Sequence, residues 1–174
     1  MAKRRGQETL GDMVRTVIVF LVIIVAAVAF LPKSHHPGNQ QVDYSGPLQV
    51  LRAAAPFPVL APQGLPAGWT ATNVRTHVPS AADRSTSFHL GFYVAAVDAY
   101  AAYEQSDAPN VASRVLGAGA HPTGRSDVAG VAYQTWADNS GGTALVGPAP
   151  GRSTVVVYGK GSAPALRTLA AALR

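Results

Sequence analysis

The chain has 174 residues and contains no cysteine, which excludes disulfides, thiol nucleophiles, zinc–thiolate sites and iron–sulfur clusters. It carries 14 Lys and Arg residues against nine Asp and Glu residues, but from Ser34 onward the numbers are nine and seven, and the charges are dispersed. So small an excess does not predict a nucleic-acid-binding face. The length that follows Ser34 is sufficient for one domain with its own core.

The first segment with a clear pattern is apolar. Residues 17–31 carry no charged or polar side chain, and residues 13–16 extend the stretch to roughly the 20 residues that cross a bilayer as a helix. Arg15 is compatible with this prediction because its stem can lie along apolar surface while the guanidinium reaches the headgroups. We therefore predict a transmembrane helix over residues 13–31 that holds the protein in the lipid bilayer.

Basic residues predict the orientation of this helix. Four of them precede the apolar run and one closely follows it: Lys3, Arg4, Arg5, Arg15 and Lys33. Basic flanks stay on the cytoplasmic side of a membrane. We therefore predict a protein of the cell membrane in which residues 1–12 are a cytoplasmic tail and the C-terminal domain is extracytoplasmic.

The alternative is a cleavable signal peptide. Ala27, Val28 and Ala29 form an A-x-A-like cleavage site after the apolar stretch. The apolar run continues beyond that site through Phe30 and Leu31, which favours an uncleaved signal anchor.

A polar segment separates the anchor from the domain. Residues 32–41 contain two prolines and a glycine, a composition typical of a tether. Residues 42–174 are then predicted to be the domain. Ser45 is expected to cap a short helix that ends before Pro56, and the four prolines of residues 56–69 predict an extended segment that wraps the edge of the core.

The next stretch predicts paired strands. We expect strands over residues 70–78 and 88–94, the latter because apolar and other side chains alternate along it. Residues 100–105 have helix propensity, yet they can also return as the second strand of a hairpin, which we favour. Asp107 is expected to cap a short helix that continues through Leu116.

The last third of the chain predicts a meander and a helix. Strands are expected over residues 128–136, 143–146 and 153–158, with turn residues between them. The successive valines at 155–157 indicate a central strand buried on both faces. Ser162 is expected to cap a final helix with a leucine stripe. The predicted fold is α+β, a mainly antiparallel sheet of about five strands with short helices packed on one face.

Several of these segments resemble one family. The basic start with GQETLGDMV, the stretch APFPVLAPQGLPAGW, the strand FHLGFYV with YAAYEQSD, and TALVG with STVVVYG are similar to the actinobacterial domain-of-unknown-function 4245 (DUF4245) family. The likeness covers nearly the whole chain, and PFPVLAPQGLPAGW at positions 56–69 is its most specific part. The resemblance implies a membrane-anchored envelope protein of actinobacteria and implies no activity.

The residues themselves predict no reaction. Three histidines, His77, His89 and His121, are widely separated in sequence, and His89 is expected at the surface because it points away from Phe88 and Leu90. Asp98, Glu104 and Asp107 are close in sequence but are expected in a solvated turn. We therefore predict no catalytic residue, no cofactor and no metal site, and a protein that is not an enzyme.

Tyrosines are the best candidates for a binding surface. Tyr93, Tyr100 and Tyr103 gather near one hairpin, although Tyr100 and Tyr103 face opposite sides if residues 100–105 form a strand. The predicted function is a single-pass membrane-anchored envelope protein that binds or supports an envelope protein partner, without nucleic acid. The alternatives are an envelope enzyme that uses histidine and carboxylate groups, and a small-molecule sensor.

Overall fold

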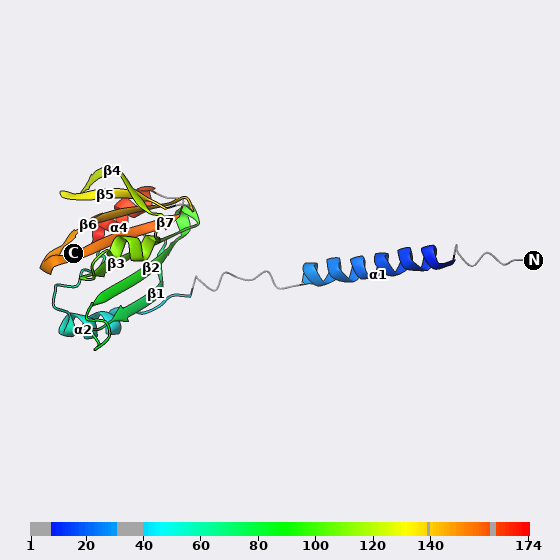
Figure 1. Cartoon of the computed structure of the whole chain (residues 1–174), viewed down its shortest axis with the longest axis horizontal. Helices are drawn as coiled ribbons and strands as arrows, with labels where there is room; N and C mark the ends of the chain where they lie inside the picture. The colour runs from blue at the N-terminus through cyan, green and yellow to red at the C-terminus, as the bar shows by residue number, and fades with distance from the viewer. Residues whose placement is uncertain (1–7, 31–39, 139, 161–162) are drawn as a thin grey trace, which may run out of the picture. The chain divides into compact units, whose positions relative to one another are not determined.

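The structure, a computed structural model, describes residues 8–30, 40–138, 140–160 and 163–174. The chain divides into two units, Met1–Pro37 and Gly38–Arg174 (Figure 1). Most of the predicted tail over residues 1–12 and of the predicted tether over residues 32–41 lies outside the described residues, as does Ser162, the expected cap of the last helix.

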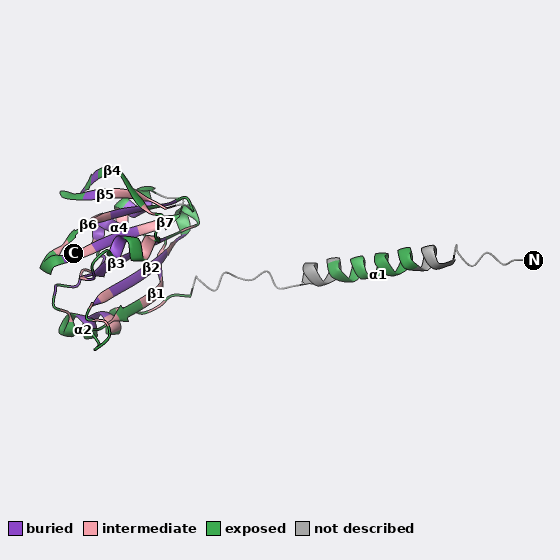
Figure 2. Ribbon diagram, viewed as in Figure 1, coloured by how far each residue is buried: buried purple, intermediate pink, exposed green. Residues whose placement is uncertain are grey.

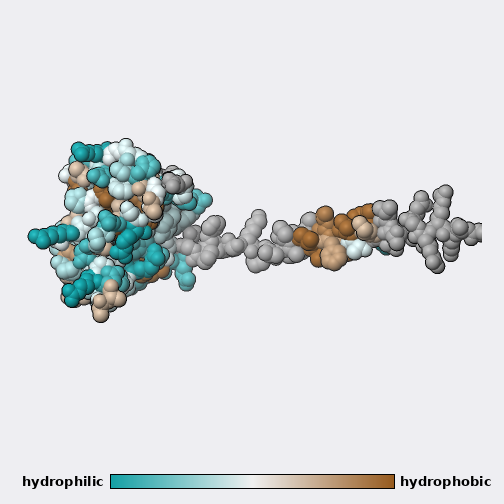
Figure 3. All heavy atoms as spheres, viewed as in Figure 1, coloured by the Kyte–Doolittle hydropathy of each residue, from teal (hydrophilic) through white to brown (hydrophobic). Residues whose placement is uncertain are grey.

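The described residues of the first unit form the helix α1 (Glu8–Phe30), whose described side chains are largely apolar (Figure 3). Glu8, Asp12 and Arg15 belong to the first eight residues of this helix. Among the described residues, no helix is both long and apolar enough to cross a membrane. The structure therefore does not support the transmembrane helix predicted over residues 13–31.

The second unit is a seven-stranded antiparallel sheet with three α-helices. The strands are β1 (Trp69–His77), β2 (Ser87–Val94), β3 (Ala99–Ser106), β4 (His121–Val128), β5 (Val131–Ala137), β6 (Gly142–Ala149) and β7 (Ser153–Lys160). The helices are α2 (Ser45–Ala54), α3 (Val111–Leu116) and α4 (Ala163–Ala172), with 3-10 turns η2 (Ala95–Val97) and η3 (Pro150–Arg152). The strand order β1-β2-β3-β7-β6-β5-β4 joins two meanders along β3 and β7.

The α+β class and the antiparallel sheet are confirmed, but the expected number of about five strands is wrong. Residues 128–136, predicted as one strand, contain the end of β4, a turn and most of β5. Ala129 and Gly130 both have positive φ, 53° and 80°, as a tight two-residue hairpin turn requires. The sequence of β4 does not have the pattern of a strand, because this edge strand is mostly exposed and includes a proline and a glycine.

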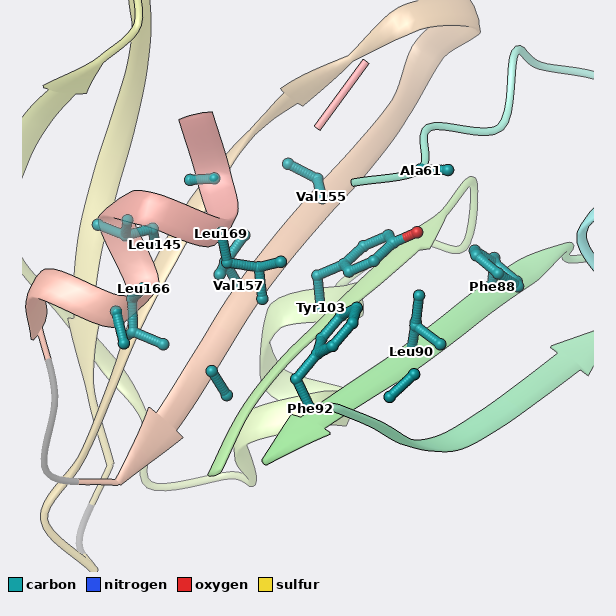
Figure 4. Packing of buried hydrophobic residues seen from close by; sticks show 14 of the residues in the cluster. Ala61, Phe88, Leu90, Phe92, Tyr103, Leu145, Val155, Val157, Leu166 and Leu169 are labelled. Atoms are coloured by element: carbon teal, nitrogen blue, oxygen red, sulfur yellow. The ribbon is translucent and has the colours of Figure 1, made fainter. Parts of the chain in front are cut away.

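One face of the sheet carries the main core. Phe88, Leu90 and Phe92 from β2 pack there with Tyr103 from β3 and Val157 from β7 (Figure 4). The leucine stripe of α4 covers this face, as predicted, and Figure 2 shows buried residues along the middle strands. The valine run of β7 is buried on both faces, as predicted.

The proline-rich segment closes the edge of this core. Its Ala61 exchanges backbone hydrogen bonds with Arg174, and Pro62 forms an isolated bridge with Leu173. Phe57 and Val59 are buried. The expected extended course of this segment along the core edge is confirmed.

The other face of the sheet carries α3, so the expectation that all helices pack on one face is wrong. Val111 and Ala112 of α3 pack on Ala144 and Val156, which belong to a second, smaller apolar cluster. The helix begins later than predicted because Asp107 accepts a hydrogen bond from the backbone N–H of Thr86 (2.7 Å) instead of capping it. We call this side of the sheet the α3 face.

Candidate functional site

A row of polar residues crosses three neighbouring strands on the α3 face. Arg75 on β1 is paired with His89 on β2, and His89 is paired with Glu104 on β3. Directly paired residues of antiparallel strands project to the same side of the sheet. Together with Arg114 from α3, these side chains line an open cleft of about 500 Å³, which we call the arginine cleft.

Strand periodicity explains why these residues meet. In β2, Phe88 and Leu90 face the main core, so His89 between them faces α3. The predicted direction of His89 is therefore right. Its predicted exposure is wrong, because only 3% of its surface is accessible in the folded domain. Neighbouring strands supply the atoms that cover it, and a single strand's pattern does not specify them.

His89 makes one hydrogen bond through its ring. The Tyr158 hydroxyl lies 3.3 Å from Nδ1, and Oε2 of Glu104 lies 3.8 Å from the same atom, beyond hydrogen-bond distance. Nε2 is buried and has no hydrogen-bond partner among the described residues. If Tyr158 donates to Nδ1, the neutral ring carries its proton on Nε2, which is then an unused donor.

Burial controls the ionisation of this cluster. It lowers the pKa of His89 to about 4, and the positive charge of Arg75 acts in the same direction. It raises the pKa of Tyr158 to about 12 and also raises the pKa of Glu104, which Arg75 and Arg114 partly oppose. At neutral pH, His89 is therefore uncharged and Tyr158 keeps its proton.

Small residues make room for the aromatic rings beside this row. Ala102 pairs with both Gly91 and Tyr158, and a side chain on Gly91 would collide with the ring of Tyr100. Tyr100 and Tyr158 also line a second pocket of about 280 Å³ with Lys160. The two pockets lie on the same face of the sheet, and Val115 of α3 contributes to both.

A contact between a histidine and a carboxylate lies at the rim of the arginine cleft. Nε2 of His77 is 3.4 Å from Oδ2 of Asp83, with both side chains more than two-fifths exposed. Oδ1 of Asp83 also accepts a hydrogen bond from the backbone N–H of Ser85 (2.9 Å). Exposed pairs of this kind contribute little stability. Its effect is to occupy the Asp83 carboxylate, which leaves that group less available to a ligand.

The three tyrosines predicted as a binding surface do not lie together. Tyr93 and Tyr100 are a direct cross-strand pair, and Tyr100 is 40% exposed. Tyr103 is completely buried in the main core, where its hydroxyl donates to the carbonyl oxygen of Leu60 (2.8 Å). The prediction is therefore wrong for Tyr103, because its strand position directs it away from the α3 face.

The histidines and acidic residues considered as catalytic candidates do not lie together either. His77 and His89 share the arginine cleft, whereas His121 is exposed on β4 at the opposite edge of the sheet. The Asp98 carboxylate accepts a hydrogen bond from Tyr93. Within the described residues, no group of three or more His, Asp or Glu side chains is arranged to hold a metal ion.

Sequence reasoning missed Arg75, Arg114 and Tyr158. Placing these residues in the cleft requires the strand register, which pairs Arg75 with His89 and Ala102 with Tyr158. Each register relates residues of two different strands, so the pattern of one strand does not contain it. The arrangement offers guanidinium donors, one neutral imidazole and one carboxyl group to a ligand, a set that suits binding of a polar ligand and also proton transfer.

The fold and the cleft define an α+β protein with one antiparallel sheet and a polar cleft on the face that carries α3. The chain belongs to the family described as protein of unknown function (DUF4245), whose model matches residues 5–173. The resemblance inferred from the sequence is thus confirmed at the level of the family. Neither a curated protein nor a solved structure matches the chain.

Proposed function

We propose that this chain is a membrane-anchored binding module of the cell envelope. In this proposal the apolar segment of residues 13–31, which includes most of α1, holds the protein in the bilayer. The domain Gly38–Arg174 lies outside the cytoplasm and binds its ligand or partner through the α3 face.

The exposed apolar side chains of α1 carry the anchoring part of the proposal. Each of eight successive residues, 17 to 24, is between 51% and 61% exposed. Eight residues make more than two helical turns at about 3.6 residues per turn, so these side chains lie on every side of the helix. Apolar surface in water is unfavourable by about 25 cal/mol per Å², and a lipid environment removes that contact.

The distribution of basic residues supports the orientation. Lys3, Arg4, Arg5 and Arg15 precede the most apolar part of the chain, and Lys33 closely follows it. Basic flanks are retained on the cytoplasmic side, and this tendency supports the proposal that the domain lies outside.

The arginine cleft supports the binding part of the proposal. Its volume of about 500 Å³ falls within the range of small-molecule sites, about 300–1,000 Å³. It also brings together charged side chains from β1, β3 and α3. An open cleft lined by charged side chains can hold one end of a ligand or a protruding group of a partner.

Membrane fractionation tests the anchor. The wild-type protein should remain with membranes after alkaline carbonate extraction, and a reporter that works only outside the cytoplasm should be active when fused after Arg174. Leu21→Arg should reduce the membrane fraction severalfold, since a central arginine costs roughly 2.5–3.5 kcal/mol on insertion. Val50→Arg is the matched control, because Val50 is an exposed apolar residue of α2.

Two results would reject this anchor. Complete release of the wild-type protein by carbonate would mean that α1 is not inserted. A soluble exported protein that begins near Phe30 would instead support a cleaved signal peptide.

A second candidate function is acid–base catalysis in the same cleft. Its support is the convergence of His89, Glu104 and Tyr158, since a neutral imidazole beside a carboxyl group can transfer protons. In a strain with a deletion phenotype, Glu104→Gln should rescue nearly as well as wild type if the cleft only binds. Loss of rescue by a folded, correctly exported Glu104→Gln protein that still binds its ligand would favour the enzyme.

A further inference from the structure

The arginine cleft has two positive groups without an ion-pair partner within 4 Å in the described part of the chain. Arg75 and Arg114 come from different elements, β1 and α3, and both line the cleft. Within the described residues, neither guanidinium forms a hydrogen bond or an ion pair within 4 Å. A guanidinium has five N–H donors in a planar fork that matches carboxylate and phosphate oxygens.

The two acidic residues of the cleft, Asp83 and Glu104, do not form an ion pair within 4 Å with either guanidinium among the described residues. The Asp83 carboxylate is occupied by His77 and by the backbone of Ser85. The Glu104 carboxyl is mostly covered, with 21% of its side chain exposed, and burial disfavours its charged form. Donors therefore outnumber free acceptors on the walls of the cleft.

His89 adds an unused group at the base of the cleft. The residue lines the cleft and is nearly completely buried, and its Nε2 has no partner in the described part of the chain. A buried N–H without an acceptor is unfavourable, and a ligand oxygen would remove this cost. When the Tyr158 hydroxyl donates to Nδ1, the proton of the neutral ring is on Nε2.

We propose that the arginine cleft binds the oxyanion group, carboxylate or phosphate, of a small ligand, with Arg75 and Arg114 as the ion-pairing residues and His89 Nε2–H as a neutral donor. This inference rests on the proposed binding function and names its ligand class. The cleft is larger than an oxyanion, so the remainder of the ligand lies toward Val115 and the open rim.

The test uses the full-length chain in a non-ionic detergent with ¹⁵N-labelled histidine. Sodium phosphate and sodium acetate are titrated separately at constant ionic strength, with chloride as the reference anion. We expect a saturable change in the His89 side-chain resonances with phosphate, with acetate or with both, and no saturable change with chloride. Saturation by phosphate alone identifies a phosphate site, and saturation by acetate alone identifies a carboxylate site.

Variants connect binding to the proposed residues. Arg75→Gln and Arg114→Gln should each weaken the affinity at least tenfold, and Arg75→Lys should weaken it less because it keeps the charge but loses the fork. Arg125→Gln is the matched control, since Arg125 is exposed on β4 at the other edge of the sheet, and its affinity should stay within twofold of wild type.

The proposal is overturned if neither anion produces a saturable change, or if all the arginine variants bind as the wild type does. Unchanged backbone spectra of Arg75→Lys without ligand separate loss of binding from loss of folding. Membrane extraction is measured on the same samples. A chain that binds an anion but leaves the membrane fraction would reject only the anchor, and an anchored chain without anion binding would reject only this site.

Discussion

The Tyr158 hydroxyl lies 3.3 Å from Nδ1 of His89, although β3 separates the strands to which the two residues belong. The contact exists because Ala102, which pairs with Tyr158 on β3, has only a methyl group, so the tyrosine ring can extend across that strand. Glu104, two residues further along β3, pairs directly with His89. The two meanders of the sheet are thus connected by side chains on the α3 face as well as by the backbone ladder between β3 and β7.

The first prediction concerns pH. His89 has a folded pKa of about 4, below its ordinary value of 6.5, so between these values the unfolded chain binds a proton that the folded chain does not. Stability should therefore be fully present above about pH 6.5 and decrease as the pH falls toward 4, by on the order of 3 kcal/mol. Urea unfolding of the full-length chain in detergent, followed by tryptophan fluorescence, measures this decrease.

Glu104 acts in the opposite direction, because its raised pKa favours the folded state as the carboxyl protonates. The contribution of His89 to the pH dependence of stability is therefore measured as the difference between wild type and a His89 variant. His89→Asn keeps an acceptor for Tyr158 and should remove most of the decrease between pH 6.5 and 4. His121→Asn, at an exposed position, should leave it unchanged. Equal pH profiles for His89→Asn and wild type would contradict the assignment.

The second prediction compares two glycines. A methyl group on Gly159 would meet the backbone carbonyl oxygen of Tyr100 and lie 3.3 Å from the backbone of Ala101. A methyl group on Gly91 would meet the ring of Tyr100, which is 40% exposed and can move. We expect Gly159→Ala to cost about 3 kcal/mol and Gly91→Ala only about 1 kcal/mol, measured by urea unfolding. In a Tyr100→Ala background, the cost of Gly91→Ala should disappear.

The third prediction concerns the docking of α4. Leu169 is completely buried and packs in the main core beside Val157 (Figure 4). Leu169→Ala should lower the free energy of unfolding by about 2–5 kcal/mol, because a cavity remains where the side chain was. Val50→Ala, at a largely exposed position of α2, should change it by less than about 0.5 kcal/mol. A small effect at Leu169 would mean that α4 is not held to the sheet as described.

Local periodicity was sufficient to predict the elements whose pattern reflects their own burial. Alternation identified β2, the valine run identified β7 as central, and the leucine stripe identified α4. These patterns succeed because one side of each element contacts the core along its whole length. The edge strand β4 has little such contact, and its proline and glycine make it resemble a loop.

The site could not be predicted in the same way, because its parts come together only through register. Arg75, His89 and Glu104 lie on three strands, and Arg114 lies on a helix whose choice of face is not apparent from its six residues. Tyr103 and Glu104 are adjacent in sequence, yet one belongs to the main core and the other to the cleft. The tyrosine cluster grouped side chains by sequence distance, which in a strand does not indicate a shared face.

The last prediction concerns Gln105, a completely buried polar residue that connects three parts of the domain. Its Oε1 accepts a hydrogen bond from the backbone N–H of Leu60 (2.8 Å). Its Nε2 donates to the carbonyl oxygen of Pro58 (2.9 Å) and to the Ser153 hydroxyl (2.8 Å). These bonds hold the proline-rich segment against β3 and β7.

Gln105→Met has nearly the same shape but leaves the Leu60 N–H and the Pro58 carbonyl without their partner. Each unsatisfied buried group costs about 1–3 kcal/mol, so we expect a loss of about 3 kcal/mol in the free energy of unfolding. Hydrogen exchange of the Leu60 amide should accelerate, because this N–H would lose its acceptor. Gln49→Met, at an exposed position of α2, is the control and should alter neither quantity. Unchanged exchange at Leu60 in a folded Gln105→Met protein would show that other contacts hold the segment in place.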